Sequence, residues 1–93
     1  MAKRTKQFHP HQGVEKAFGD AMRKSREKLG MSQLALQTRT GLDRTFISDL
    51  ERGVQCPSLR TVIRVAKGLN MAADKLTKLT TDSPYFVFPT SES

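Results

Sequence analysis

The sequence is poor in the residues that build disulfides, metal centres and membrane spans. It has one cysteine, Cys56, no tryptophan and two histidines, His9 and His11, in 93 residues. A lone cysteine closes no internal disulfide, and a closed zinc site needs more ligands than the chain supplies unless both histidines join it. No apolar run approaches the ~18 residues of a membrane span, and no apolar segment follows the basic start as in a signal peptide. We therefore expect a cytoplasmic protein with no metal, cofactor or membrane association.

Acidic residues are scarce as well. The chain carries 9 Asp and Glu against 16 Lys and Arg, which gives a net charge of +7. The excess lies in residues 1–28 and 54–79, on either side of a neutral middle segment, and such asymmetry indicates a polyanionic partner. The alternative is that these residues only solvate the surface. A chain of this length forms one small domain, and no nucleophile with supporting residues suggests an enzyme.

Hydrophobic spacing and capping residues divide the chain into three parts. Residues 1–13 form a flexible basic arm, residues 14–79 a helical domain, and residues 80–93 a tail. Helices are predicted from Val14 to about Leu29, over 33–40 and 44–52, after Ser58, and over 72–79, because apolar residues recur at helical spacing. Ser32, Asp43 and Ser58 are suitable N-caps. The domain is therefore predicted to be all-α, and the apolar stripe of the fourth helix, which includes Leu59 and Ile63, is assigned mainly to the core.

The second and third helices have the lengths and the intervening glycine of a helix-turn-helix. In and around them the sequence resembles the Cro/CI (XRE-type) helix-turn-helix regulators, from about Phe18 to Leu79. The matching stretches are Phe18-Gly19, Gly30-Met31-Ser32-Gln33, Gly41-Leu42, Ile47-Ser48, Leu50-Glu51-Arg52-Gly53 and Pro57-Ser58-Leu59. The resemblance implies a five-helix, lambda-repressor-like DNA-binding domain. The run Leu42 to Ser48 is most similar to the controller proteins of restriction-modification systems.

The third helix carries the candidate base-reading residues. Ile47 and Leu50 mark its core side, so Thr45, Ser48, Asp49 and Arg52 project the other way. Arg44 flanks them in the first turn. The candidates for DNA contact are therefore Arg44, Thr45, Ser48, Asp49 and Arg52, of which Arg44 can bind guanine and Arg52, at the helix end, a phosphate. For each of them the alternative is a solvated surface residue.

The resemblance implies further roles around this helix. Gln33 matches a glutamine that clamps a DNA phosphate in the family; the alternative is a second cap for the helix that begins there. Arg26 and Glu51 match an ion pair that ties the first helix to the third. The sequence departs from the family at Gln37, where a small alanine is usual, and at Ser25, where an apolar residue is usual.

The tail gathers aromatic residues between two prolines, Pro84 and Pro89. It could dock on its own domain, cross to a second subunit or bind another protein. A single short helix reads few bases, so we expect a homodimer, in which two such helices lie about 34 Å apart. Helices four and five are the expected interface, and the residues assigned to it are Leu76, Leu79, Tyr85, Phe86 and Phe88.

The sequence thus predicts a homodimeric, sequence-specific regulator that binds double-stranded DNA at a pseudo-palindromic operator, as a repressor or a restriction-modification controller. One alternative is the antitoxin of a toxin–antitoxin pair, whose tail would bind its toxin. Another is a protein-interaction module that uses the same fold.

Overall fold

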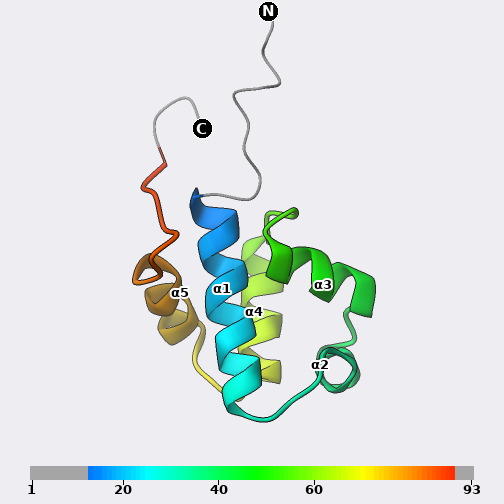
Figure 1. Ribbon diagram of the computed structural model, residues 1–93. Coiled ribbons are helices and arrows are strands. Elements are labelled where there is room, and N and C mark those ends of the chain that lie inside the picture. Colours follow the sequence, from blue (N-terminus) through cyan, green and yellow to red (C-terminus); the bar gives the residue numbers. More distant parts are fainter. Residues whose placement is uncertain (1–12, 90–93) are drawn as a thin grey trace, which may run out of the picture.

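The computed structural model describes residues 13–89, which form five helices and, within that range, no strand. The helices are α1 (Gly13–Lys28), α2 (Gln33–Thr40), α3 (Arg44–Arg52), α4 (Leu59–Gly68) and α5 (Ala73–Thr81). The predicted all-α, five-helix fold is confirmed, with α2 and α3 at their predicted bounds. Helix α1 stands between α3 and α5 (Figure 1). The predicted basic arm lies outside the described residues except for Gly13, which begins α1.

Side-chain caps explain where three of the helices begin. The Ser32 hydroxyl accepts from the Ala35 amide at 2.9 Å, the Asp43 carboxylate from the Thr45 amide at 2.9 Å, and the Ser58 hydroxyl from the Thr61 amide at 3.1 Å. Each bond satisfies an amide that has no acceptor inside its own helix. Helices α2 and α3 both end at a left-handed glycine, Gly41 and Gly53. Local sequence therefore sets the bounds of the two central helices.

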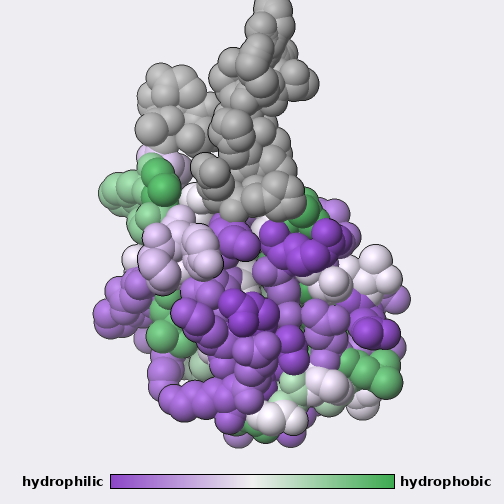
Figure 2. All heavy atoms as spheres, viewed as in Figure 1, coloured by the Kyte–Doolittle hydropathy of each residue, from purple (hydrophilic) through white to green (hydrophobic). Residues whose placement is uncertain are grey.

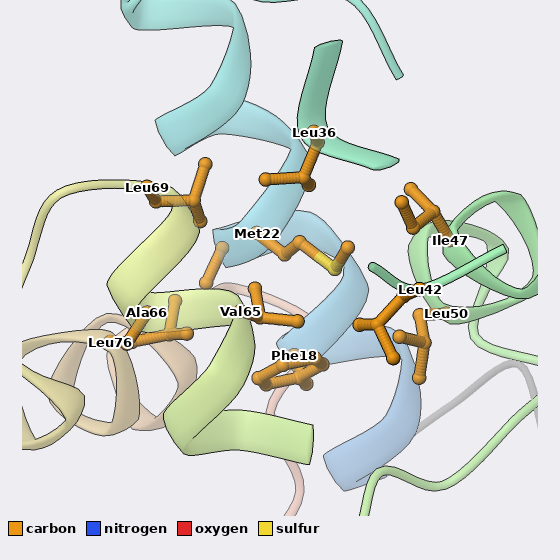
Figure 3. Close-up of a cluster of buried hydrophobic side chains, with 11 residues drawn as sticks. Phe18, Met22, Leu36, Leu42, Ile47, Leu50, Val65, Ala66, Leu69 and Leu76 are labelled. Carbon is orange, nitrogen blue, oxygen red and sulfur yellow. The ribbon is translucent and has the colours of Figure 1, made fainter. Parts of the chain in front are cut away.

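The core lies where all five helices meet (Figure 3). Met22, Leu36, Ile47, Leu50, Val65 and Leu76 are each fully buried. The assignment of Leu76 to a dimer interface was wrong, because this side chain of α5 is inside the protein's own core. Helical spacing identifies an apolar stripe, but not which of its members the neighbouring helices cover.

The apolar stripe of α4 is only partly covered by the core. Val65, Ala66 and Leu69 are buried, whereas Leu59 is 74% exposed and Ile63 is 52% exposed. The prediction that this stripe serves mainly the core was therefore wrong for Leu59 and Ile63. These two residues are four apart, so they lie on one side of the helix and form an apolar surface that no other part of residues 13–89 covers.

Helix α1 crosses α3 at Gly19. A Cβ atom at this position would lie 2.5 Å from the carbonyl oxygens of both Leu50 and Glu51. The absence of a side chain lets the last turn of α3 approach α1 closely. This contact fixes the inner side of α3 and leaves its other side to solvent.

The first residues of the tail dock on α1 of the same chain. The Ser83 hydroxyl donates to the buried Asp20 carboxylate at 3.0 Å, and the Lys16 ammonium lies 4.9 Å from the centre of the Tyr85 ring. Farther along, Val87 is 60% exposed and Phe88 is 78% exposed. Figure 2 shows this segment as green apolar surface beside the purple, hydrophilic body. The tail is therefore anchored at its base and leaves apolar side chains uncovered.

Candidate nucleic-acid interface

The outer side of α3 presents the five candidate reading residues together. Arg44, Thr45 and Arg52 are exposed, and Ser48 and Asp49 are half-buried. Ile47 and Leu50, on the opposite side, are fully buried. Figure 1 shows α3 at the edge of the molecule, on the side of α1 away from α5. The helix can therefore approach a groove of DNA with this side while its other side stays in the core.

Asp49 and Arg52 pair with each other on that surface. The Arg52 guanidinium donates to the Asp49 carboxylate at 2.6 Å, across one turn of the helix. Both charges already have a partner, so a contact from Asp49 to a cytosine amine would have to replace this bond. Arg44 and Thr45, in the first turn, are the residues whose side chains face solvent at the leading end of α3.

Helix α2 holds the start of α3 through a side chain that the sequence did not identify as functional. The Gln37 side-chain oxygen accepts from the Arg44 amide at 2.7 Å. Together with the Asp43 cap, it binds the first two amides of α3. An alanine, which is usual here in the family, could not make this bond. The departure from the family pattern at Gln37 thus adds a link between the two helices.

Arg26 and Glu51 form the ion pair that the resemblance implied. Arg26 Nε and Nη2 donate to the two Glu51 oxygens at 2.7 and 2.9 Å, and Arg26 Nη1 donates to the Met31 carbonyl at 2.7 Å. The hydrogen bond to Glu51 is the main reason that the Arg26 pKa is raised above its ordinary value. This bidentate pair locks the last turns of α1 and α3 together.

Gln33 joins the same network. Its side-chain nitrogen donates to the Glu51 carboxylate at 3.0 Å, and Gln33 itself is half-buried at the first position of α2. The Ser32 hydroxyl occupies the Ala35 amide, whereas the Gln33 and Leu34 amides belong to the first turn, where N–H groups have no acceptor inside the helix. Such a turn suits a phosphate. The contact of Gln33 with a phosphate stays a prediction.

Residues 13–89 contain neither a metal-binding cluster nor a membrane-spanning helix. In this range no group of three or more His, Cys, Asp or Glu side chains is placed to hold a metal ion. No helix of the described chain has the length and apolar character needed to cross a membrane.

Comparison with known proteins identifies a family that has this helix-turn-helix. The family model described as "Helix-turn-helix" matches residues 22–76. The control protein C.BamHI of Bacillus amyloliquefaciens is 38% identical over 65 residues, which cover 69% of this chain and 80% of that protein. The uncharacterized HTH-type transcriptional regulator y4dJ of Sinorhizobium fredii (strain NBRC 101917 / NGR234) is 26% identical over 72 residues, which cover 77% of this chain and 94% of y4dJ.

Solved structures of restriction-modification controller proteins have the same fold. The controller C.AhdI from Aeromonas hydrophila matches with a TM-score of 0.64 and 32% identity, over 68% of this chain and 94% of that one. The controller C.Esp1396I, solved as a tetramer in complex with its natural 35 base-pair operator, matches with a TM-score of 0.69 and 25% identity, over 74% of this chain and 91% of that one. The protein therefore belongs to the XRE-type helix-turn-helix family of DNA-binding transcriptional regulators.

Proposed function

We propose that this protein is a sequence-specific regulator that binds a pseudo-palindromic operator in double-stranded DNA as a homodimer, as a repressor or a restriction-modification controller. The observation that carries the proposal is the exposed first turn of α3. Arg44 and Thr45 face solvent there, and Gln37 and Asp43 hold the turn in place from behind. The likeness to C.BamHI and C.AhdI supports the controller role.

The roles of the reading residues follow from their chemistry and position. Arg44 donates two hydrogen bonds to the O6 and N7 atoms of guanine, and Thr45 offers a hydroxyl or a methyl group to a neighbouring base. Ser48, one turn further on, contacts the next base, and Asp49 accepts from cytosine if it releases Arg52. Arg52, at the end of α3, binds a phosphate and so sets the position of the helix without reading sequence.

Gln33 places the protein on the DNA backbone. One N–H of its side-chain amide donates to the Glu51 carboxylate, so the second N–H is the group that can donate to a phosphate from the first turn of α2. In the proposed complex a phosphate binds the first-turn amides of α2, and Gln33 steadies that turn against α3.

The dimer interface is proposed on α4. Leu59 and Ile63 form an exposed apolar stripe there, and a shallow hollow of about 420 Å³ continues it past Ile63 to Met71, Ala72 and Ala73. A surface of this kind is typical of a contact between subunits. Two subunits joined by the same surface are related by a two-fold axis, as a palindromic operator requires. The other predicted interface residues, Leu79, Tyr85, Phe86 and Phe88, lie along α5 and the tail and extend this interface.

Selection from a random duplex library tests the DNA-binding proposal. Purified protein should enrich an inverted repeat with half-sites about one DNA turn apart. Arg44→Ala should lose the enrichment, whereas Lys78→Ala, which removes one positive charge from α5, should keep it. Retention without a motif that fades with salt would mean that the +7 charge acts alone on phosphates, and would overturn the proposal.

Sedimentation of an α4 variant tests the dimer. Ile63→Glu places a charge in the proposed interface and should yield a monomer with reduced operator affinity. Leu34→Glu, at a position on α2 that is 58% exposed, is the matched control and should remain dimeric. A dimer that persists in Ile63→Glu would exclude this surface.

A second function, the binding of another protein, is favoured by the tail, because Tyr85, Val87 and Phe88 are exposed. This second function would apply both to an antitoxin and to a protein-interaction module. A partner bound equally by the wild type and by an Arg44→Ala, Thr45→Ala double variant, and lost on Phe88→Ser, would establish this function.

A further inference from the structure

A hollow of about 500 Å³ opens between α1 and α5, on the far side of α1 from α3. Its volume lies within the range of about 300–1,000 Å³ that is usual for small-molecule sites. Apolar side chains make most of its wall, namely Ala21, Leu29, Leu69, Met71 and Leu79. In Figure 2 a small green patch is visible between α1 and α5, with purple surface around it. The hollow is apart from the reading side of α3.

Ser25 brings a buried hydroxyl to this hollow. The residue is only 9% exposed, it lines the hollow, and its hydroxyl has no hydrogen-bond partner among residues 13–89. Because the hollow is open to solvent, this hydroxyl is available to a molecule that enters it, in exchange for water. A ligand atom that accepts or donates in the hollow would supply the missing partner.

The charged groups around the hollow give it a positive rim. The two acidic residues that line it already form ion pairs. The Asp20 carboxylate lies 3.4 Å from the Lys24 ammonium, and the Asp82 carboxylate lies 2.9 Å from the Lys78 ammonium. Lys28 at the end of α1 and Lys75 on α5 also line the hollow, and neither has an ion-pair partner within the described chain. Two exposed lysines on different helices therefore stand at the edge of the hollow, and no acid pairs with either of them among residues 13–89.

We propose that the α1–α5 hollow binds a small amphipathic organic anion. The apolar body of the ligand contacts Leu69 and Leu79, its carboxylate or phosphate lies between Lys28 and Lys75, and Ser25 completes the polar contacts. Charge-assisted hydrogen bonds from the two lysines select an anion over an uncharged analogue of the same shape. This proposal is independent of which DNA sequence the protein reads.

An NMR titration of the full chain with decanoate, below the concentration at which it forms micelles, tests the proposal. Decanoate should produce saturable shifts of the backbone amides around Ala21, Ser25, Leu69 and Leu79. Decanol, which has the same apolar chain without the charge, should bind in the same place about tenfold more weakly.

Two double variants distinguish decanoate binding in the hollow from general attraction of an anion to a basic protein. Lys28→Ala with Lys75→Ala should lower the affinity for decanoate about tenfold and leave that for decanol unchanged. Lys16→Ala with Lys67→Ala removes the same charge from positions that do not line the hollow, and should bind decanoate like the wild type. Equal losses in the two variants, or shifts spread over every exposed lysine, would overturn the proposal.

Ser25→Leu tests the cavity itself. The larger side chain narrows the hollow and removes the hydroxyl, so it should weaken decanoate binding while the melting temperature and DNA binding persist. Unchanged decanoate binding in Ser25→Leu would overturn the proposal, as would the absence of saturable binding to the wild type by both decanoate and 1-naphthoate. If Ser25→Leu does not fold, the two lysine variants decide the question.

Discussion

The side-chain oxygen of Gln37 lies 2.7 Å from the backbone nitrogen of Arg44, so a residue of α2 caps the helix that is proposed to read DNA. Helix α3 has two caps, one from the loop before it and one from its neighbour. The orientation of Arg44 is thereby tied to α2, which is proposed to bind the DNA backbone. The proposed contact of α2 with the DNA backbone and the proposed base reading by α3 are therefore structurally coupled.

Gln37→Ala should weaken both the fold and the DNA contact. Loss of this hydrogen bond should lower the free energy of unfolding by about 1 kcal/mol and reduce operator affinity more than stability alone explains, because the first turn of α3 loosens. Denaturant unfolding and a DNA titration measure the two effects. Thr38→Ala, at the next position, is the control: its exposed hydroxyl bonds only the Leu34 carbonyl of the same helix, so this change should affect stability little and operator affinity not at all.

The Arg26–Glu51 pair should behave as a unit. Arg26→Ala or Glu51→Ala alone leaves a charge without its partner in a half-buried or buried place, and should cost about 3–5 kcal/mol. The Arg26→Met, Glu51→Leu double variant should be more stable than either single variant, because no isolated charge remains. A double-mutant cycle in denaturant, built from Arg26→Met, Glu51→Leu and their combination, measures the coupling, and additive losses would contradict the prediction.

Gly19→Ala should destabilise the protein more than Gly68→Ala does. At Gly19 the new methyl group meets the backbone oxygens of Leu50 and Glu51 at 2.5 Å, and these cannot move without α3. At Gly68 it meets side-chain atoms of Thr40 and Leu36. We expect a loss of about 3 kcal/mol at Gly19 and a smaller loss at Gly68, where side chains can adjust. Thermal unfolding of the two variants provides the comparison.

The Cys56 thiol should ionise at a higher pH than a free cysteine. Burial raises its pKa, and the negative charge of Glu15 raises it further. Since the thiolate is the reactive form, alkylation by iodoacetamide at pH 8 should be slower than for a cysteine peptide. Glu15→Gln should recover part of the rate, because burial remains. The unfolded chain ionises first, so this thiol makes folding less favourable as the pH rises above its unfolded pKa.

The sequence predicted those parts of the structure that short-range chemistry determines. Ser32, Asp43, Gly41 and Gly53 set the ends of α2 and α3 within a few residues of themselves, so both helices could be delimited correctly. The ion pair between Arg26 and Glu51, 25 residues apart, came only from resemblance to a family, because nothing local brings those side chains together.

The errors concern which apolar and polar side chains a neighbouring helix covers. Leu76 and Leu79 both belong to the apolar stripe of α5, and only packing decides that Leu76 is in the core while Leu79 is partly exposed. The same holds for Val65 and Ile63 on α4. The contact from Gln37 to Arg44 depends on the angle between two helices, which no spacing rule gives.

The hydrogen bond between Ser83 and Asp20 joins positions 63 residues apart. Because it reaches back to the first helix, the part of the chain that packs on the helical body extends past the end of α5 at least to Ser83. A deletion that stops at residue 82 would strip a buried carboxylate of its hydroxyl partner, whereas one that stops at residue 84 would remove only the aromatic segment. Shortened chains intended to isolate the role of the aromatic residues should therefore keep Ser83, since otherwise a loss of stability would be mistaken for a loss of association.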